Sequence, residues 1–188
     1  MREKASQRRK LKSISMKFYS GFTLENEEIY FDKYINQSRY TICGFSYGAI
    51  KAFEDVKERL RDLKRVDTLQ LFSPAFFQNR DEKFKKMQLL GFIKNRDLYI
   101  DNFIKACFYP YSEKNVEHNE DTIDELKELL FYEWSKEELH VVAQSGVKIE
   151  VYLGERDKII DASIAKAFFL EFSTVTYIKD ANHFLLTS

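Results

Sequence analysis

The stretch Gly44-Phe45-Ser46-Tyr47-Gly48 decides how this chain folds, because it lies between a predicted strand and a predicted helix. Before it, Tyr40-Thr41-Ile42-Cys43 is typical of a short buried strand. After it, apolar residues recur at helical spacing, at Ile50, Phe53, Val56, Leu60 and Leu63. The stretch fits G-x-S-x-G, in which a serine occupies a sharp strand-to-helix turn and points its hydroxyl away from the sheet. The two glycines let strand and helix approach closely.

An acid and a histidine follow the serine late in the chain, each after a predicted strand. The strand Lys148-Ile149-Glu150-Val151-Tyr152-Leu153 ends in Gly154-Glu155-Arg156-Asp157. The strand 174–178 runs into Asp180-Ala181-Asn182-His183. An acid thus follows one late strand and a histidine follows the final one, both after Ser46 in the chain, which is the order Ser…Asp/Glu…His. The alternative for Ser46 is a tight glycine-rich turn with an idle serine.

The three residue types form a proton-transfer set. Ser46 is a weak nucleophile at neutral pH, and His183 is the base that would take its proton. Asp157 would hold the imidazole in the right tautomer. Asp161 and Asp180 are rivals for that role, but Asp161 has the position of a helix N-cap and Asp180 lies only three residues from His183.

A tetrahedral intermediate of acyl transfer also needs two N–H donors. One is expected from the amide of Tyr47, directly after the serine. The other is expected from the amide of Phe22, in the loop Ser20-Gly21-Phe22 that ends the first predicted strand. The alternative for Gly21 is an ordinary turn after a strand.

The order of predicted elements indicates an α/β fold with about five, mostly parallel strands. The strands are expected at 16–20, 39–44, 66–72, 148–153 and 174–178, and the first helices at 24–37 and 47–64. Residues 75–145 carry aromatic-rich helical patterns and no strand signal, which predicts an all-helical cap inserted over the serine. One face of the sheet should be thinly covered, so we expect the N-terminal segment or a second subunit to cover it.

Length and charge limit the function classes. The chain has 188 residues, enough for a single domain at 16–188, and a formal net charge of zero argues against a nucleic-acid binder. Residues 1–15 are rich in Lys and Arg and are expected to be a disordered basic tail; they either attract an acidic partner or precede a natural start at Met16.

The remaining sequence signals favour a cytoplasmic protein without cofactor or metal. No segment has the apolar core of a secretory signal or the length of a membrane span. Cys43 and Cys107 do not make a disulfide framework, and both are expected to pack in the core. His118 and His140 lack metal-ligand spacing, and no nucleotide-binding motif is present.

At this point the chain resembles the α/β-hydrolase superfamily, and within it the short pimeloyl-acyl carrier protein methyl ester esterases of biotin synthesis (the BioV type). The resemblance covers Met16 to the C-terminus. It rests on Phe18-Tyr19-Ser20-Gly21-Phe22, Gly44-Phe45-Ser46-Tyr47-Gly48-Ala49-Ile50-Lys51-Ala52, Leu71-Phe72-Ser73-Pro74, Tyr99-Ile100-Asp101-Asn102-Phe103, Gly146-Val147-Lys148-Ile149-Glu150-Val151 and Asn182-His183.

The resemblance implies hydrolysis of the methyl ester on a pimeloyl chain carried by acyl carrier protein, with release of methanol. It implies Ser46, Asp157 and His183 as the catalytic triad, and Phe22 and Tyr47 as the oxyanion donors. The chain departs from the common pattern at Ser20, where a His-Gly pair is usual, and it lacks the early strands and the long final helix.

The implied partner suggests a docking surface. Acyl carrier proteins are strongly acidic, so the surface should be basic. Basic residues cluster in the predicted cap at Arg80, Lys83, Lys85, Lys86, Lys94 and Arg96. The alternative is a solvated helix face balanced by Asp81, Glu82 and Asp97. Two other functions stay open: a general short-chain esterase or thioesterase, and a non-catalytic hydrolase-like binding scaffold.

Overall fold

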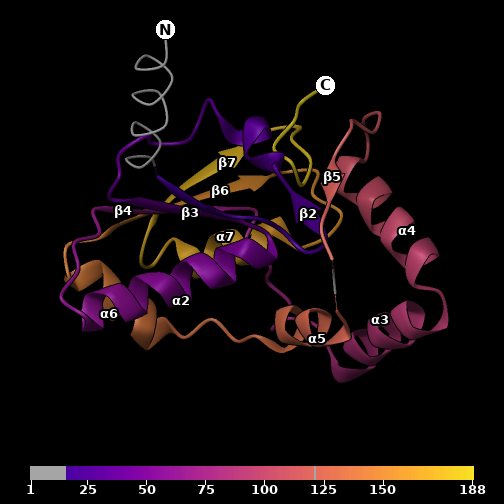
Figure 1. Cartoon of the computed structure of the whole chain (residues 1–188), viewed down its shortest axis with the longest axis horizontal. Coiled ribbons are helices and arrows are strands. Elements are labelled where there is room, and N and C mark those ends of the chain that lie inside the picture. The colour runs from indigo at the N-terminus through magenta and orange to yellow at the C-terminus, as the bar shows by residue number, and fades with distance from the viewer. Residues whose placement is uncertain (1–15, 121) are drawn as a thin grey trace, which may run out of the picture.

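A five-stranded parallel sheet forms the centre of the molecule (Figure 1). The computed structural model describes residues 16–120 and 122–188, so the predicted basic tail at 1–15 lies outside the described residues. The strand order is β1-β3-β4-β6-β7, and every pair of neighbours is parallel. The strands are β1 (Lys17–Tyr19), β3 (Thr41–Phe45), β4 (Thr68–Phe72), β6 (Lys148–Gly154) and β7 (Thr174–Ile178). The predicted fold class is confirmed.

Helices cover one face of this sheet. Figure 1 shows α2 (Tyr47–Arg61), α6 (Lys136–Gln144) and α7 (Ala162–Phe169) on the same side. Between them lies the indole of Trp134, whose centroid is 5.4 Å from that of Phe53 and 5.1 Å from that of Phe169. The expected helix at 47–64 therefore forms, and its apolar residues face the sheet.

The opposite face is covered by a short 3₁₀ helix, η1 (Glu27–Phe31), and the loop after it. The Phe31 ring stacks 4.8 Å from Phe72 and 4.9 Å from Phe45. The helix predicted at 24–37 is thus wrong. The left-handed backbone of Asn26, with φ 59°, separates η1 from the two-residue strand β2 (Leu24–Glu25). The polar periodicity of this stretch reflects a covering loop with one buried aromatic anchor rather than a long helix.

The segment between β4 and β6 extends beyond the end of the sheet. It contains α3 (Glu82–Lys94), α4 (Arg96–Phe108) and α5 (Ile123–Phe131), which Figure 1 shows grouped to one side of the sheet. The segment is not all-helical as predicted, because β5 (Glu117–His118) pairs antiparallel with β2. This pairing joins the cap to the loop that follows β1.

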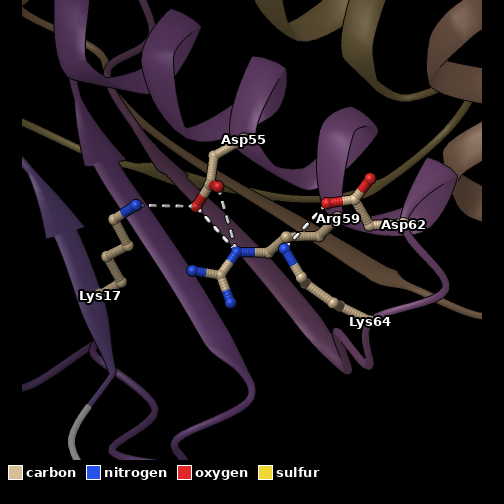
Figure 2. A network of polar contacts seen from close by, with 5 residues as sticks. All are labelled: Lys17, Asp55, Arg59, Asp62 and Lys64. Atoms are coloured by element: carbon tan, nitrogen blue, oxygen red, sulfur yellow. Dashed lines mark hydrogen bonds and ion pairs between the residues drawn. The ribbon is translucent and has the colours of Figure 1, made fainter.

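Charged side chains fasten the edge strand β1 to α2. Figure 2 shows Lys17 of β1 reaching Asp55 at 3.2 Å, while Arg59 donates to both oxygens of the same carboxylate at 3.0 and 3.1 Å. One turn beyond, Lys64 and Asp62 form an exposed pair at 2.8 Å. The Asp55 cluster ties the strand that leads into the Ser20-Gly21-Phe22 loop to the helix that follows Ser46.

Candidate active site

Ser46 occupies a strained turn between β3 and α2. Its backbone has φ 53° and ψ −114°, a region that non-glycine residues rarely adopt. The Ser46 N–H donates to Phe72 O at 2.9 Å, and its carbonyl accepts from the amides of Ala49 and Ala75 at 3.1 and 3.0 Å. These bonds to two neighbouring elements hold the turn in its strained conformation.

The two glycines of the motif are required by close packing. A Cβ on Gly44 would lie 2.2 Å from Gly48 O, and one on Gly48 would lie 2.0 Å from Tyr19 O. Any side chain there would push the start of α2 away from β3 or from the end of β1. The second contact also brings the loop after Tyr19 next to the residue that follows Ser46.

The three predicted triad residues meet at one edge of the sheet. Ser46 Oγ lies 3.0 Å from His183 Nε2, and His183 Nδ1 lies 2.6 Å from Asp157 Oδ2. The side chains of His183 and Asp157 are fully buried, and Ser46 is 5% exposed. This is the arrangement in which a base removes the serine proton while a carboxylate fixes its tautomer.

The loop carrying Asp157 is shaped by that carboxylate. Its second oxygen, Oδ1, accepts from the amides of Ile159 and Ile160 at 2.7 and 3.1 Å. These bonds leave Oδ2 directed at the imidazole. The rival acids lie elsewhere: Asp161 caps α7 by accepting from Ile164 N, and Asp180 pairs with Arg156 at 2.5 Å.

Two polar residues that the sequence did not single out position the histidine loop. Ser73 Oγ donates to the carbonyl of His183 at 2.7 Å, and Asn182 Nδ2 donates to Phe108 O at 2.8 Å. Ser73, Asn182 and His183 are all buried. A Cβ on Gly154 would lie 2.3 Å from Asn182 O, so the acid and histidine loops touch. The Ser73-Pro74 ending of β4 marked a turn, but nothing in the sequence paired it with His183.

The two expected oxyanion donors lie beside one another. Ser20-Gly21-Phe22 and Tyr47 line the same small cavity of about 160 Å³. Among the residues that the structure describes, no acceptor is found for the N–H of Phe22. The N–H of Tyr47 is the first of α2 and has no intrahelical partner. Within the described residues both amides are therefore unengaged, as expected oxyanion donors need to be.

A larger cavity of about 330 Å³ lies between the triad loops and the cap. From the triad side it is lined by Phe22, Lys158 and Ile159. Its other walls come from the cap helices and the segment before them, with the residues Phe77, Phe84, Gln88, Tyr99, Asn102, Phe103, Ala106, Leu126, Leu129 and Leu130. The mainly apolar lining suits an acyl chain.

The predicted basic cluster is only partly a surface feature. Lys85 is 5% exposed and lies over the Phe131 ring at 5.0 Å, so it cannot meet a partner, and its place in the predicted docking surface is corrected. Arg96 is exposed but paired with Asp97 at 3.1 Å. On the outer face of α3, three exposed lysines alternate with three exposed apolar residues: Lys83, Lys86, Met87, Leu90, Ile93 and Lys94. Arg80, also exposed, stacks on Phe84.

The remaining titratable candidates lie outside the site's chemistry. Burial raises the pKa of the Cys43 thiol to about 12 and that of Cys107 well above its ordinary value. His118 and His140 are both exposed, the first on β5 and the second on α6 beside Gln144. Within 16–120 and 122–188, no helix is long and apolar enough to cross a bilayer.

Comparison with known proteins finds similarity among solved structures only. The sequence matches no protein-family model and no curated protein sequence. Among solved structures, carboxylesterase CesB from Bacillus subtilis superposes with a TM-score of 0.62 at 13% identity, over 94% of this chain and 79% of that one. Naproxen esterase from Bacillus subtilis gives 0.57 at 16% identity, over 93% and 79%.

BioG from Haemophilus influenzae is similar over 90% of this chain and 88% of that one, with a TM-score of 0.55 at 12% identity. With its parallel sheet, its strand-to-helix serine turn and its acid and histidine after the last two strands, this chain has the α/β-hydrolase fold.

Proposed function

We propose that this protein is a serine carboxylesterase that hydrolyses the methyl ester of pimeloyl-acyl carrier protein, giving pimeloyl-acyl carrier protein and methanol. The observation that carries the esterase part is the unbroken chain of contacts from Ser46 through His183 to Asp157. The carboxylesterases that share the fold support it, and the choice of substrate rests on the resemblance of the sequence to the short esterases of biotin synthesis.

Acylation begins with Ser46 Oγ attacking the ester carbonyl while His183 Nε2 takes the hydroxyl proton. Asp157 stabilises the imidazolium that forms. The carbonyl oxygen becomes an oxyanion, which accepts hydrogen bonds from the amides of Phe22 and Tyr47. Collapse of this intermediate breaks the bond to the methoxy oxygen. His183 returns its proton to that oxygen, and methanol leaves.

Deacylation repeats these steps with water. His183 removes a proton from water, whose oxygen attacks the acyl-Ser46 carbonyl, and then returns the proton to Ser46 Oγ. The carboxylate formed at Ser46 then leaves with the product, and the free serine is restored.

The acyl chain would occupy the cavity that shares Phe22 with the oxyanion loop. Tyr99, Phe103 and Leu130 are among its walls, and they offer apolar contact along a chain of several methylene groups. The carrier protein would sit outside, on the lysine and apolar face of α3, where positive charge complements an acidic partner and Met87, Leu90 and Ile93 give it apolar contact.

The test is methanol release from purified pimeloyl-acyl carrier protein methyl ester, measured for the native protein and for Ser46→Ala. We expect rapid release by the native protein and a loss of at least about 10³-fold in kcat for the variant. Asn36→Ala, on the covering loop of the sheet, is the matched control and should retain activity.

Other outcomes separate the alternatives. Native protein that hydrolyses p-nitrophenyl acetate but not the carrier-bound ester would keep the triad and remove the carrier substrate. Absence of turnover together with no labelling of Ser46 by a fluorophosphonate would contradict the enzyme proposal altogether and favour a binding scaffold.

A further inference from the structure

A buried carboxyl group lies directly behind the loop that carries Phe22. Glu27, the first residue of η1, is 1% exposed, and its Oε1 accepts from the Gly21 N–H at 2.6 Å. Its Oε2 is also buried and has no hydrogen-bond partner within the described part of the chain. Burying a carboxyl group with one oxygen unpaired costs free energy, so its place here calls for an explanation.

The hydrogen bonds around Gly21 fix the direction of the Phe22 N–H. The Gly21 carbonyl and the Phe22 N–H belong to one planar trans peptide and point in opposite directions. Leu24 N–H donates to Gly21 O at 3.2 Å, so the Phe22 N–H points away from that turn. Glu27 holds the preceding peptide through the Gly21 N–H. Both peptides that flank the Gly21 Cα are thereby anchored.

Gly21 needs such anchors. Glycine has the widest backbone freedom, and a free Gly21 would let both peptides rotate. A side chain at this position would be crowded, because a Cβ there would lie 3.0 Å from the Phe45 ring. Glu27 restrains the backbone instead, through its hydrogen bond from the Gly21 N–H.

We propose that Glu27 is a positioning residue, which holds the Ser20-Gly21-Phe22 loop so that the Phe22 N–H faces the oxyanion above Ser46. The role rests on the proposed esterase function. Burial raises the pKa of Glu27, while hydrogen bonding from the Gly21 amide, its own amide and the Ser20 side chain acts in the opposite direction. A side-chain amide in place of the carboxyl keeps the same oxygen acceptor without charge, so glutamine should replace glutamate in this role.

The test compares kcat and KM for p-nitrophenyl acetate in the native protein, Glu27→Gln and Glu27→Leu, with Glu28→Leu as the neighbouring control. Losing one oxyanion donor costs about 10²–10³-fold in kcat. We expect Glu27→Leu to lose about 100-fold in kcat with KM within about twofold, and both Glu27→Gln and Glu28→Leu to stay within about threefold. A general loss of folding would not separate the leucine and glutamine variants in this way.

A second readout does not depend on turnover. Amide hydrogen exchange at Gly21 should be slow in the native protein and in Glu27→Gln, and at least about tenfold faster in Glu27→Leu, because a lost bond of about 1.4 kcal/mol changes the opening equilibrium tenfold. Native kcat in Glu27→Leu, equal losses in both Glu27 variants, or unchanged Gly21 exchange would overturn the proposal. Native protein without any esterase turnover would contradict the proposed function, and Gly21 exchange would still decide whether Glu27 anchors the loop.

Discussion

At the scale of single residues, each catalytic side chain is oriented by hydrogen bonds or backbone geometry outside the triad itself. Asp157 is fixed by two backbone amides, His183 by Asp157 and by the bond from Ser73 to its carbonyl, and Ser46 by a backbone conformation with φ 53°. Each holds one reacting atom within hydrogen-bond distance of the next. Removing the orienting carboxylate should therefore cost rate and leave the fold intact.

Asp157→Asn is expected to lower kcat by about 10⁴-fold, because an amide at this position favours the wrong imidazole tautomer. KM and the unfolding midpoint should change little, since asparagine can still accept from Ile159 and Ile160 through its side-chain oxygen. Steady-state hydrolysis of p-nitrophenyl acetate measures the effect. Asp161→Asn is the control, and it should keep full activity because asparagine caps helices as well as aspartate. Equal losses in the two variants would contradict the assignment.

The triad could be predicted from the sequence because each member directly follows a recognisable strand. The parallel sheet converts that sequence pattern into proximity. Ser73, Asn182 and Glu27 could not be predicted in the same way. Ser73 and Asn182 act through contacts with distant segments, as when Ser73 reaches the carbonyl of His183 across 110 residues of chain, and Glu27 folds back on Gly21 through a turn that the sequence pattern did not predict. Nothing local to these residues distinguishes them from ordinary turn or helix-start residues.

At the scale of elements, α5 is fastened to α2 by three polar contacts on matching helical faces. The pairs are Tyr47 with Glu128 at 2.6 Å, Lys51 with Glu125 at 3.2 Å, and Tyr132 with Glu54 at 2.6 Å. The buried side of α5 supplies Leu126, Leu129 and Leu130 to the cavity of about 330 Å³. The position of the cavity wall is therefore set by contacts that begin at the residue after Ser46.

Loosening these contacts should affect long substrates selectively. In the double variant Glu125→Ala, Tyr132→Phe, the lost bond to Glu54 is worth about 1.5 kcal/mol and the partly exposed Lys51 pair under about 1 kcal/mol, so amide exchange in α5 should rise at least tenfold. KM for a pimeloyl ester should rise, while kcat for p-nitrophenyl acetate should stay near native. Lys127→Ala, on the outer face of α5, is the control. An unchanged pimeloyl KM would show that α5 does not bound the acyl site.

The contact between β1 and α2 should be sensitive to acid, because it depends on the cluster of Lys17, Asp55 and Arg59 shown in Figure 2. Burial alone would raise the pKa of Asp55, but the hydrogen bonds from Arg59 and Lys17 hold it below its ordinary value. A carboxyl group whose pKa is depressed by folding stabilises the protein above its unfolded pKa, and this contribution is lost as pH falls through the folded pKa.

Asp55→Asn should therefore lower the unfolding free energy at pH 7 by about 1 kcal/mol, and the difference from the native protein should shrink as pH falls below about 4. Urea unfolding between pH 3 and pH 7 measures it. Asp62→Asn removes only an exposed pair and should change nothing measurable. A difference between native and Asp55→Asn that persisted at pH 3 would point to lost packing rather than lost charge.

At the scale of the whole molecule, the sheet could be predicted from the alternation of apolar strands and helices. The layer of η1 and its loop, on the face opposite α2, could not. The sequence predicted a helix at 24–37, whereas Phe31 and Tyr34 anchor a covering segment on Phe72 and Tyr152. Aromatic contacts from Phe31 and Tyr34 anchor that segment, and helical periodicity does not report them. The expectation that the N-terminal segment or a second subunit covers this face is answered, within the described residues, by η1 and its loop.

The outer face of α3 gives the whole molecule a place for an acidic carrier. Replacing Lys83, Lys86 and Lys94 together by glutamate should raise KM for the carrier-bound ester at least about tenfold, with kcat and p-nitrophenyl acetate hydrolysis unchanged. KM of the native protein should rise with salt, because exposed charges are screened. The same reversal at the exposed Lys33, Lys64 and Lys127 is the control. Equal effects of both triple variants would exclude a specific binding role for the outer face of α3.

The order of the triad along the chain has a consequence for synthesis. His183 follows Ser46 by 137 residues and Asp157 by 26. Chains grow from the N-terminus, and early elements can fold before later ones exist. A nascent chain that has already built β1, β3, β4 and β6 would carry its serine without a base to activate it. Catalytic activity is thus acquired last, and an incompletely synthesised chain without His183 would be inactive rather than an unregulated hydrolase.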